Sequence, residues 1–143
     1  MTAQDYLQNL LTTCARYELS ESDQQVIQDR GIADFIYTKL TSKKFRKWAV
    51  DEDSKLQIKQ AIELCVAEDR PLQIRYPFGG YKLWSMPGAP EVDWAEFFSI
   101  AYYISYLAPI AAAYAPGLEF AFASDDVIIE RMDNVPLADT QAY

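Results

Sequence analysis

The feature of the sequence that most constrains its fold is a long apolar segment from Trp94 to Tyr114. Apolar residues occur on every side of its helical wheel, and this distribution is typical of a buried helix. Pro109 and several Tyr and Ser residues make the segment too polar for a membrane span. Short segments with alternating apolar and polar residues flank it at 71–76 and 118–123, as expected for strands.

Glycine and proline separate these segments. Pro77, Gly79 and Gly80 follow the first strand-like segment, and Pro116 and Gly117 end the helical one. The order is therefore strand, glycine loop, helix, strand and acidic turn. It predicts one βαβ unit with parallel strands and a right-handed crossover.

The first half of the chain is predicted to be helical. Amphipathic spacing indicates helices over about 2–17, 22–30, 32–40 and 51–69, and a short basic helix over 43–50. The expected fold class is thus α/β, a helical N-terminal half followed by a βαβ unit with a small parallel sheet. We expect a single domain over residues 1–143, with a helical part (1–69), a βαβ part (70–135) and a tail (136–143).

Composition restricts the function. The chain has 143 residues and a net charge of −8, which argues against nucleic acid and against anionic membranes as partners. Its first residues include an early Asp and no basic region, so we expect a cytoplasmic protein rather than a secreted one. Histidine is absent, which excludes a Ser-His-Asp or Cys-His mechanism. Cys14 and Cys65 have no metal-binding spacing; we expect buried reduced thiols, no metal and no cofactor.

The glycine loop is the first candidate site. Phe78, Gly79, Gly80 and Lys82 follow the predicted strand, and paired glycines let backbone N–H groups approach an anion that Lys82 could neutralise. The alternative interpretation is a tight turn with a solvated lysine.

The acidic turn is the second candidate site. Ser124, Asp125 and Asp126 follow the second strand, where a carboxylate could hold Mg²⁺ with water or accept a hydroxyl or an amine. The alternative is a helix N-cap. Arg75 lies within the first strand and either faces the same crevice or points outward from an edge strand. Because parallel strands place their carboxyl ends at one edge of a sheet, we expect both turns to line one ligand crevice.

Two further groups have a structural and a functional interpretation. Five of the 13 basic residues lie within nine positions, from Lys39 to Lys47, followed by Trp48. This cluster is either a single-strand nucleic-acid contact or a solvated helix face that pairs with residues 51–53. Helical spacing brings Tyr102, Tyr106 and Tyr114 near one stripe, which is either core packing or the wall of a pocket for an aromatic ligand.

Residues 71–134 resemble the isocyanide (isonitrile) synthase family, which includes the enzymes that begin dityrosine formation. The similarity rests on Pro77-Phe78 followed by Lys82, on the acidic start of the long helix from Asp93 to Glu96, on residues 114–117 (Tyr-Ala-Pro-Gly) and on Ser124-Asp125. The resemblance implies a Rossmann-like fold and conversion of an aromatic amino acid's amine to an isonitrile, with a pentulose phosphate as carbon donor. It implies that Lys82 anchors a phosphate or the substrate and that Asp125 accepts an amine or hydroxyl.

The sequence therefore supports two functional hypotheses. The first is a domain that binds a small anionic or amino-acid-like metabolite. The second is a non-enzymatic interaction domain, such as a homodimer, with Trp48, Trp84 or Trp94 as an aromatic anchor.

Overall fold

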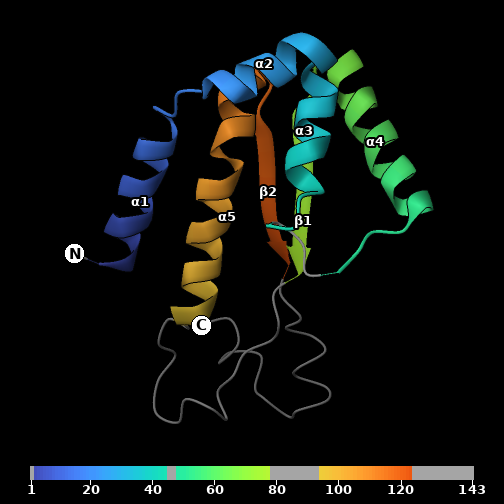
Figure 1. The fold of residues 1–143 in the computed structure, drawn as a ribbon. Coiled ribbons are helices and arrows are strands. Elements are labelled where there is room, and N and C mark those ends of the chain that lie inside the picture. Colours follow the sequence, from blue (N-terminus) through green and yellow to red (C-terminus); the bar gives the residue numbers. More distant parts are fainter. Residues whose placement is uncertain (1, 45–47, 78–93, 124–143) are drawn as a thin grey trace, which may run out of the picture. The chain divides into compact units, whose positions relative to one another are not determined.

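The computed structural model describes residues 2–44, 48–77 and 94–123 (Figure 1). Within these ranges the chain forms helices in its first half and a helix between two strands in its second, which confirms the mixed helix and strand composition. The elements are α1 (Ala3–Cys14), α2 (Glu21–Arg30), α3 (Ile32–Leu40), α4 (Glu52–Ala67), β1 (Leu72–Pro77), α5 (Trp94–Ala113) and β2 (Leu118–Ala123).

The chain divides into two compact units that do not follow sequence order. One comprises residues 1–72 and 100–119, and the other comprises residues 73–99 and 120–143. The first unit contains α1 to α4 and most of α5.

Helix boundaries follow local capping chemistry. Thr2 Oγ1 accepts a hydrogen bond from the Asp5 N–H at 3.1 Å, and the Asp5 carboxylate accepts the Thr2 N–H at 2.8 Å, forming a capping box at α1. Ser20 caps α2 and Asp51 caps α4 by simple N-caps, in which each side chain accepts a hydrogen bond from the N–H three residues on. These caps satisfy N–H groups that a helix leaves without internal partners.

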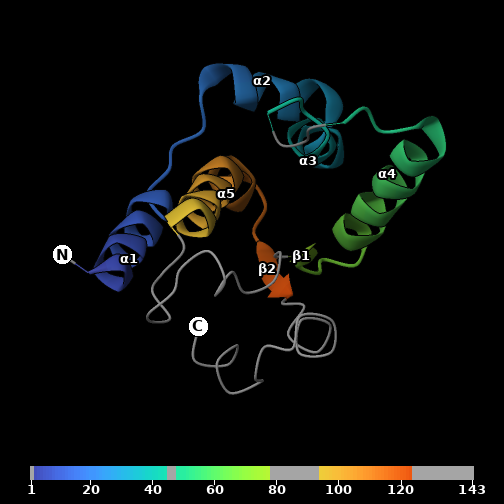
Figure 2. The ribbon, with the colours of Figure 1, turned by 90° about the horizontal axis from the view of Figure 1, so that it is seen from below.

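Gly31 sets the bend between α2 and α3. Its φ of 84° and ψ of 166° lie in a region that only glycine occupies readily. The bend allows α3 to contact both α2 and α4 (Figure 2).

The core of the first unit is built on α3 and α5. Phe35 and Ile36 of α3 are 1% and 0% exposed, and Ile110 of α5 is fully buried. Ile62 of α4 is also buried, although most of that helix is exposed. The apolar face of α3 therefore stabilises the unit mainly by removing these side chains from water.

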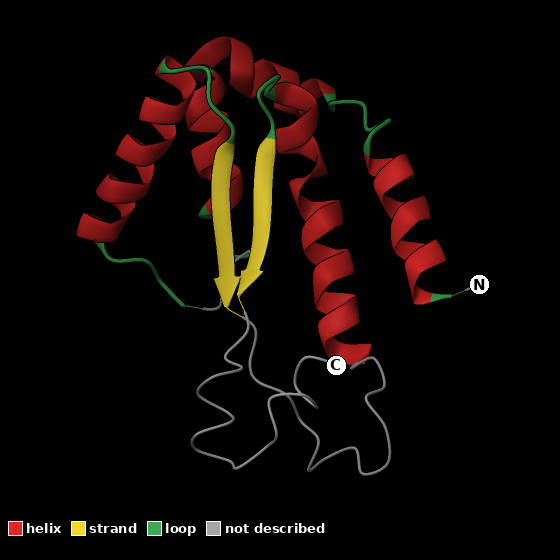
Figure 3. Ribbon diagram, turned by 180° about the vertical axis from the view of Figure 1, so that it is seen from behind, coloured by secondary structure: helices red, strands yellow, loops and turns green. Residues whose placement is uncertain are grey.

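β1 and β2 form a two-stranded sheet in which both strands run in the same direction (Figure 3). The Leu72 N–H donates to the Gly117 carbonyl at 3.1 Å and sets the register at the start of the pair. Tyr76 and Phe120 stack with ring centroids 6.5 Å apart. The prediction of parallel strands joined through a helix is confirmed.

Two secondary-structure expectations were wrong. No helix is present in the described residues of the predicted basic helix 43–50; residues 43–44 form a turn and residues 48–50 are irregular, while 45–47 lie outside the described residues. Side-chain hydroxyls, described below, bond the backbone of this turn and replace helical hydrogen bonds. α5 is also not buried on all sides, because Phe98 and Tyr102 are 59% and 46% exposed.

Candidate functional site

The carboxyl ends of β1 and β2 lie at the same edge of the sheet because the strands are parallel (Figure 3). β1 ends at Pro77 and β2 ends at Ala123. The predicted ligand-binding turns begin directly after these residues. The residues of those turns lie outside the described residues and stay predictions; they are Phe78, Gly79, Gly80, Lys82, Ser124, Asp125 and Asp126.

Arg75 is the one predicted site residue within the described ranges. It is exposed, as is Gln73, whereas Leu72 is buried and Ile74 and Tyr76 are half-buried. This alternation is the two-residue period of a strand with one covered face. Arg75 therefore lies on the exposed face of β1, two residues before the strand ends.

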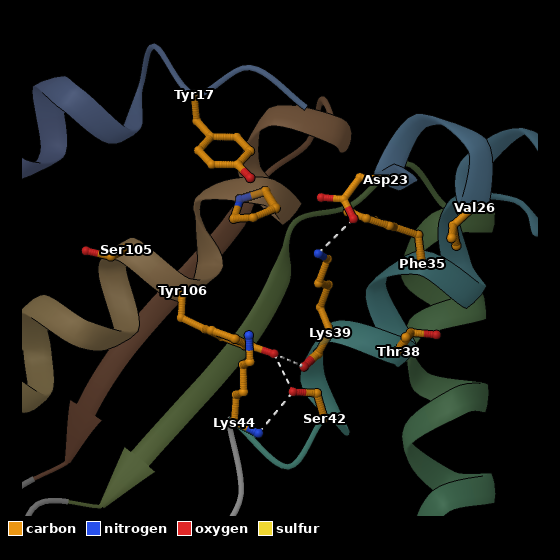
Figure 4. Close-up of a pocket in the computed structure, with 11 residues that line it drawn as sticks. Tyr17, Asp23, Val26, Phe35, Thr38, Lys39, Ser42, Lys44, Ser105 and Tyr106 are labelled. Carbon is orange, nitrogen blue, oxygen red and sulfur yellow. Dashed lines mark hydrogen bonds and ion pairs between the residues drawn. The ribbon is translucent and has the colours of Figure 1, made fainter. Parts of the chain in front are cut away.

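The first unit contains a pocket of about 380 Å³ that sequence reasoning did not predict (Figure 4). Residues of α2, α3 and α5 line it, together with Tyr17 and the turn after α3. Its lining combines apolar side chains with two lysines, one aspartate and several hydroxyl groups.

An ion pair joins α3 to α2 at this pocket. The Lys39 ammonium lies 2.9 Å from an Asp23 carboxylate oxygen, and the two side chains are only 24% and 14% exposed. The same ammonium lies 5.2 Å from the ring centroid of Phe35. Partial burial strengthens such a pair relative to a surface ion pair, because fewer water dipoles screen it. Lys39 thus has a fixed position.

A hydroxyl chain fixes the turn after α3. Tyr106 Oη donates to the Lys39 carbonyl at 2.9 Å and lies 2.6 Å from Ser42 Oγ. Each hydroxyl has one proton, so Ser42 must donate to Tyr106 when Tyr106 donates to the carbonyl. Ser42 Oγ also accepts the Lys44 N–H at 3.1 Å.

Tyr102 of α5 adds a second tyrosine contact to the turn after α3. Tyr102 stacks on Tyr106 with centroids 5.8 Å apart, and its hydroxyl donates to the Lys44 carbonyl at 2.6 Å. The three tyrosines of the predicted stripe therefore make different contacts. Tyr106 lines a pocket and Tyr102 anchors a turn, whereas Tyr114 serves a separate structural contact.

Tyr114 holds the loop between α4 and β1. Its side chain is 5% exposed, and its hydroxyl lies 2.9 Å from the Cys65 carbonyl and 2.7 Å from the Arg70 carbonyl. Burial is the main cause that raises the pKa of Tyr114 above its ordinary value of 10.0. This contact anchors the loop that leads into β1.

The basic cluster differs from its sequence interpretation. Lys39 pairs with Asp23 of α2 and not with residues 51–53, and Asp51 is occupied as the α4 cap. Lys43 and Lys44 are exposed. Asp23 and Lys39 are sixteen positions apart on different helices, so no local spacing could have indicated their pairing. The 43–44 turn was missed for the same reason, because the hydrogen bond to the Lys44 carbonyl comes from Tyr102 of α5.

Both cysteines are free, as expected, but each is half-buried where full burial was predicted. No group of three or more potential metal-binding side chains occurs among the residues that the structure describes. Within those same ranges, no helix combines the length and apolar composition that a membrane span requires. Comparisons with protein-family models, curated proteins and solved structures find no match to this chain.

Proposed function

We propose that the chain binds a small anionic or amino-acid-like metabolite at the carboxyl edge of the β1–β2 pair, within a Rossmann-like βαβ unit. The observation that carries this proposal is the parallel pairing of the two strands, with α5 between them in sequence. In open α/β sheets, ligands bind in the crevice outside the carboxyl ends of the strands.

The residue types after each strand suit such a ligand. Gly79 and Gly80 would let backbone N–H groups approach an anion, and Lys82 would supply a positive charge. Asp125 would accept an amine or hydroxyl proton across the crevice. The two side chains together would recognise a molecule with an anionic group at one end and an amine at the other.

The resemblance to isocyanide synthases supports an aromatic amino acid and a pentulose phosphate as the ligands to test first. The protein should therefore be titrated with L-tyrosine and with ribulose 5-phosphate while thermal unfolding is followed. Ligand at about ten times its Kd stabilises the folded state by roughly 1.4 kcal/mol, which raises the Tm by about 3–6 °C for a domain of this size.

Lys82→Ala and Asp125→Ala should abolish this stabilisation and leave the unfolding transition of the free protein unchanged. Lys43→Ala is the matched control, because Lys43 is an exposed lysine in the turn after α3. Stabilisation that persists in both site variants would reject the proposed crevice. If neither L-tyrosine nor ribulose 5-phosphate stabilises the protein, an aromatic amino acid and a pentulose phosphate are rejected as its ligands.

A second candidate function is protein–protein interaction. Leu56 and Leu64 of α4 are 57% and 52% exposed, and Trp48 before that helix is 74% exposed. Large exposed apolar side chains are common at interfaces. Of the other two predicted anchors, Trp84 lies outside the described residues and Trp94 is the first residue of α5. Light scattering that shows only monomer over a wide concentration range would exclude the homodimer.

A further inference from the structure

We propose that the pocket beside α3, distinct from the sheet edge, binds a small aromatic carboxylate. Its lining includes two lysines and one aspartate, so the lining side chains carry a net charge of +1 in a chain whose net charge is −8. A local positive charge of this kind attracts an anion.

The hydrogen-bond donors of the pocket point to the same ligand class. The hydroxyl protons of Ser42 and Tyr106 are used in the chain to the Lys39 carbonyl. The Ser105 hydroxyl donates to the Ala101 carbonyl at 2.9 Å. Three of the five lining hydroxyls are thus committed to protein acceptors, whereas those of Tyr17 and Thr38 make no hydrogen bond to the described residues; the charged donors of the pocket are the ammonium groups of Lys39 and Lys44.

The two ammonium groups differ in their roles. Lys39 donates one N–H to Asp23, and its other two N–H groups make no hydrogen bond to the residues that the structure describes. The Lys44 ammonium makes no ion pair within the described ranges. In the view of Figure 4, the Lys39 ammonium points toward Asp23, and Lys44 is drawn on the opposite side of Lys39 from Asp23. Hydrogen bonds from ammonium groups to a carboxylate are stronger than those between neutral groups, so a carboxylate is the group that these two lysines would bind best.

An apolar wall defines the rest of the ligand. Tyr17, Val26, Phe35 and Pro109 contribute it; Phe35 and Pro109 are buried and Val26 is half-buried. The volume of about 380 Å³ lies near the lower end of small-molecule sites and suits one aromatic ring with a short acidic side chain.

Phenylacetate is a suitable probe because phenylacetamide matches its shape without its charge. Binding of both should be measured by calorimetry and by saturation-transfer NMR on the full chain. We expect phenylacetate to bind in the millimolar range, and phenylacetamide to bind roughly tenfold more weakly because it lacks the charge-assisted bonds. Binding should also weaken with added salt.

Lys44→Gln is the decisive variant, because Lys44 is exposed and its ammonium supports no ion pair in the described structure. We expect it to weaken phenylacetate binding roughly tenfold, with unchanged thermal unfolding. Lys43→Gln removes a neighbouring exposed charge outside the pocket and should leave binding unchanged. Asp125→Ala should also bind phenylacetate normally, which separates this site from the sheet edge.

Three results would overturn the proposal. They are no phenylacetate binding at millimolar concentrations, equal binding of the amide, and equal losses in Lys44→Gln and Lys43→Gln. L-tyrosine also carries an aromatic ring and a carboxylate, whereas ribulose 5-phosphate has no ring. Stabilisation by ribulose 5-phosphate, and its loss in Asp125→Ala, therefore tests the sheet edge independently of this pocket.

Discussion

Removing the Tyr114 hydroxyl should destabilise the protein without leaving a cavity. The hydroxyl of this buried residue is placed between the carbonyls of Cys65 and Arg70. The Cys65 carbonyl also accepts the Arg70 N–H at 3.0 Å, so it keeps one partner in Tyr114→Phe. The substitution therefore leaves mainly the Arg70 carbonyl without the hydrogen bond that it accepts from Tyr114. An unsatisfied buried acceptor costs about 1–3 kcal/mol, and we expect about 1–2 kcal/mol because Arg70 is otherwise exposed.

Urea unfolding measures this difference directly. With a denaturant slope of about 2 kcal/mol per molar, the midpoint should fall by about 0.5–1 M with no change in slope. Tyr37→Phe is the matched control. Tyr37 is half-buried, and its hydroxyl makes no hydrogen bond to the described residues. A midpoint for Tyr114→Phe equal to that of the control would refute the argument that this contact anchors the loop into β1.

The pH dependence of stability gives a second test of the same contact. Burial raises the pKa of Tyr114, so the folded state keeps the phenol proton at a pH where the unfolded state loses it. Its stabilising contribution is therefore present below about pH 10 and is lost as the pH rises further. Tyr114→Phe should lose less stability than the wild type above pH 10. An identical decline in both proteins would contradict the assignment.

Two other predictions concern the helices. Gly31→Ala should lower the free energy of unfolding by about 1–3 kcal/mol in urea titrations, because its φ of 84° strains any other residue although no atom lies within 4 Å of an added Cβ. An unchanged free energy of unfolding in Gly31→Ala would show that alanine also forms the bend between α2 and α3 without strain. Hydrogen bonds from Ser54 lower the pKa of Asp51, so this cap stabilises α4 above about pH 4 and is lost as the pH falls below it. The protection factor of the Ser54 amide, its exchange rate relative to the intrinsic rate at the same pH, should fall on acidification and in Asp51→Ala, but not in Asp53→Ala at neutral pH; an equal fall in both variants would contradict this.

Local chemistry explains why much of the fold could be predicted. The first turns of α1, α2 and α4 follow from Thr2, Ser20 and Asp51, whose side chains bond N–H groups three residues away. Gly31 marks the α2–α3 boundary because its φ favours glycine. The βαβ order follows from the change in apolar periodicity, and parallel pairing follows from that order.

The pocket could not be predicted because its contacts join distant parts of the sequence. Ser42 and Tyr106 are 64 positions apart, and Lys44 and Tyr102 are 58 apart. These contacts also explain the absence of a helix at 43–44, where α5 supplies hydrogen bonds that replace helical ones. Helical spacing placed Tyr106 and Tyr114 near one stripe of the helix, but their surroundings differ. Tyr106 is half-buried, lines the pocket and donates to the Lys39 carbonyl, whereas Tyr114 is buried and donates to the Cys65 carbonyl.

Formation of a disulfide between residues 82 and 125 would most directly test whether the glycine loop and the acidic turn line one crevice. Lys82→Cys and Asp125→Cys should be combined in a protein whose Cys14 and Cys65 are replaced by serine, and oxidised mildly with and without urea. A crosslink that forms rapidly in the folded protein and slowly in urea is the predicted result. Equal crosslinking rates in the folded and unfolded protein, or none when folded, would contradict it.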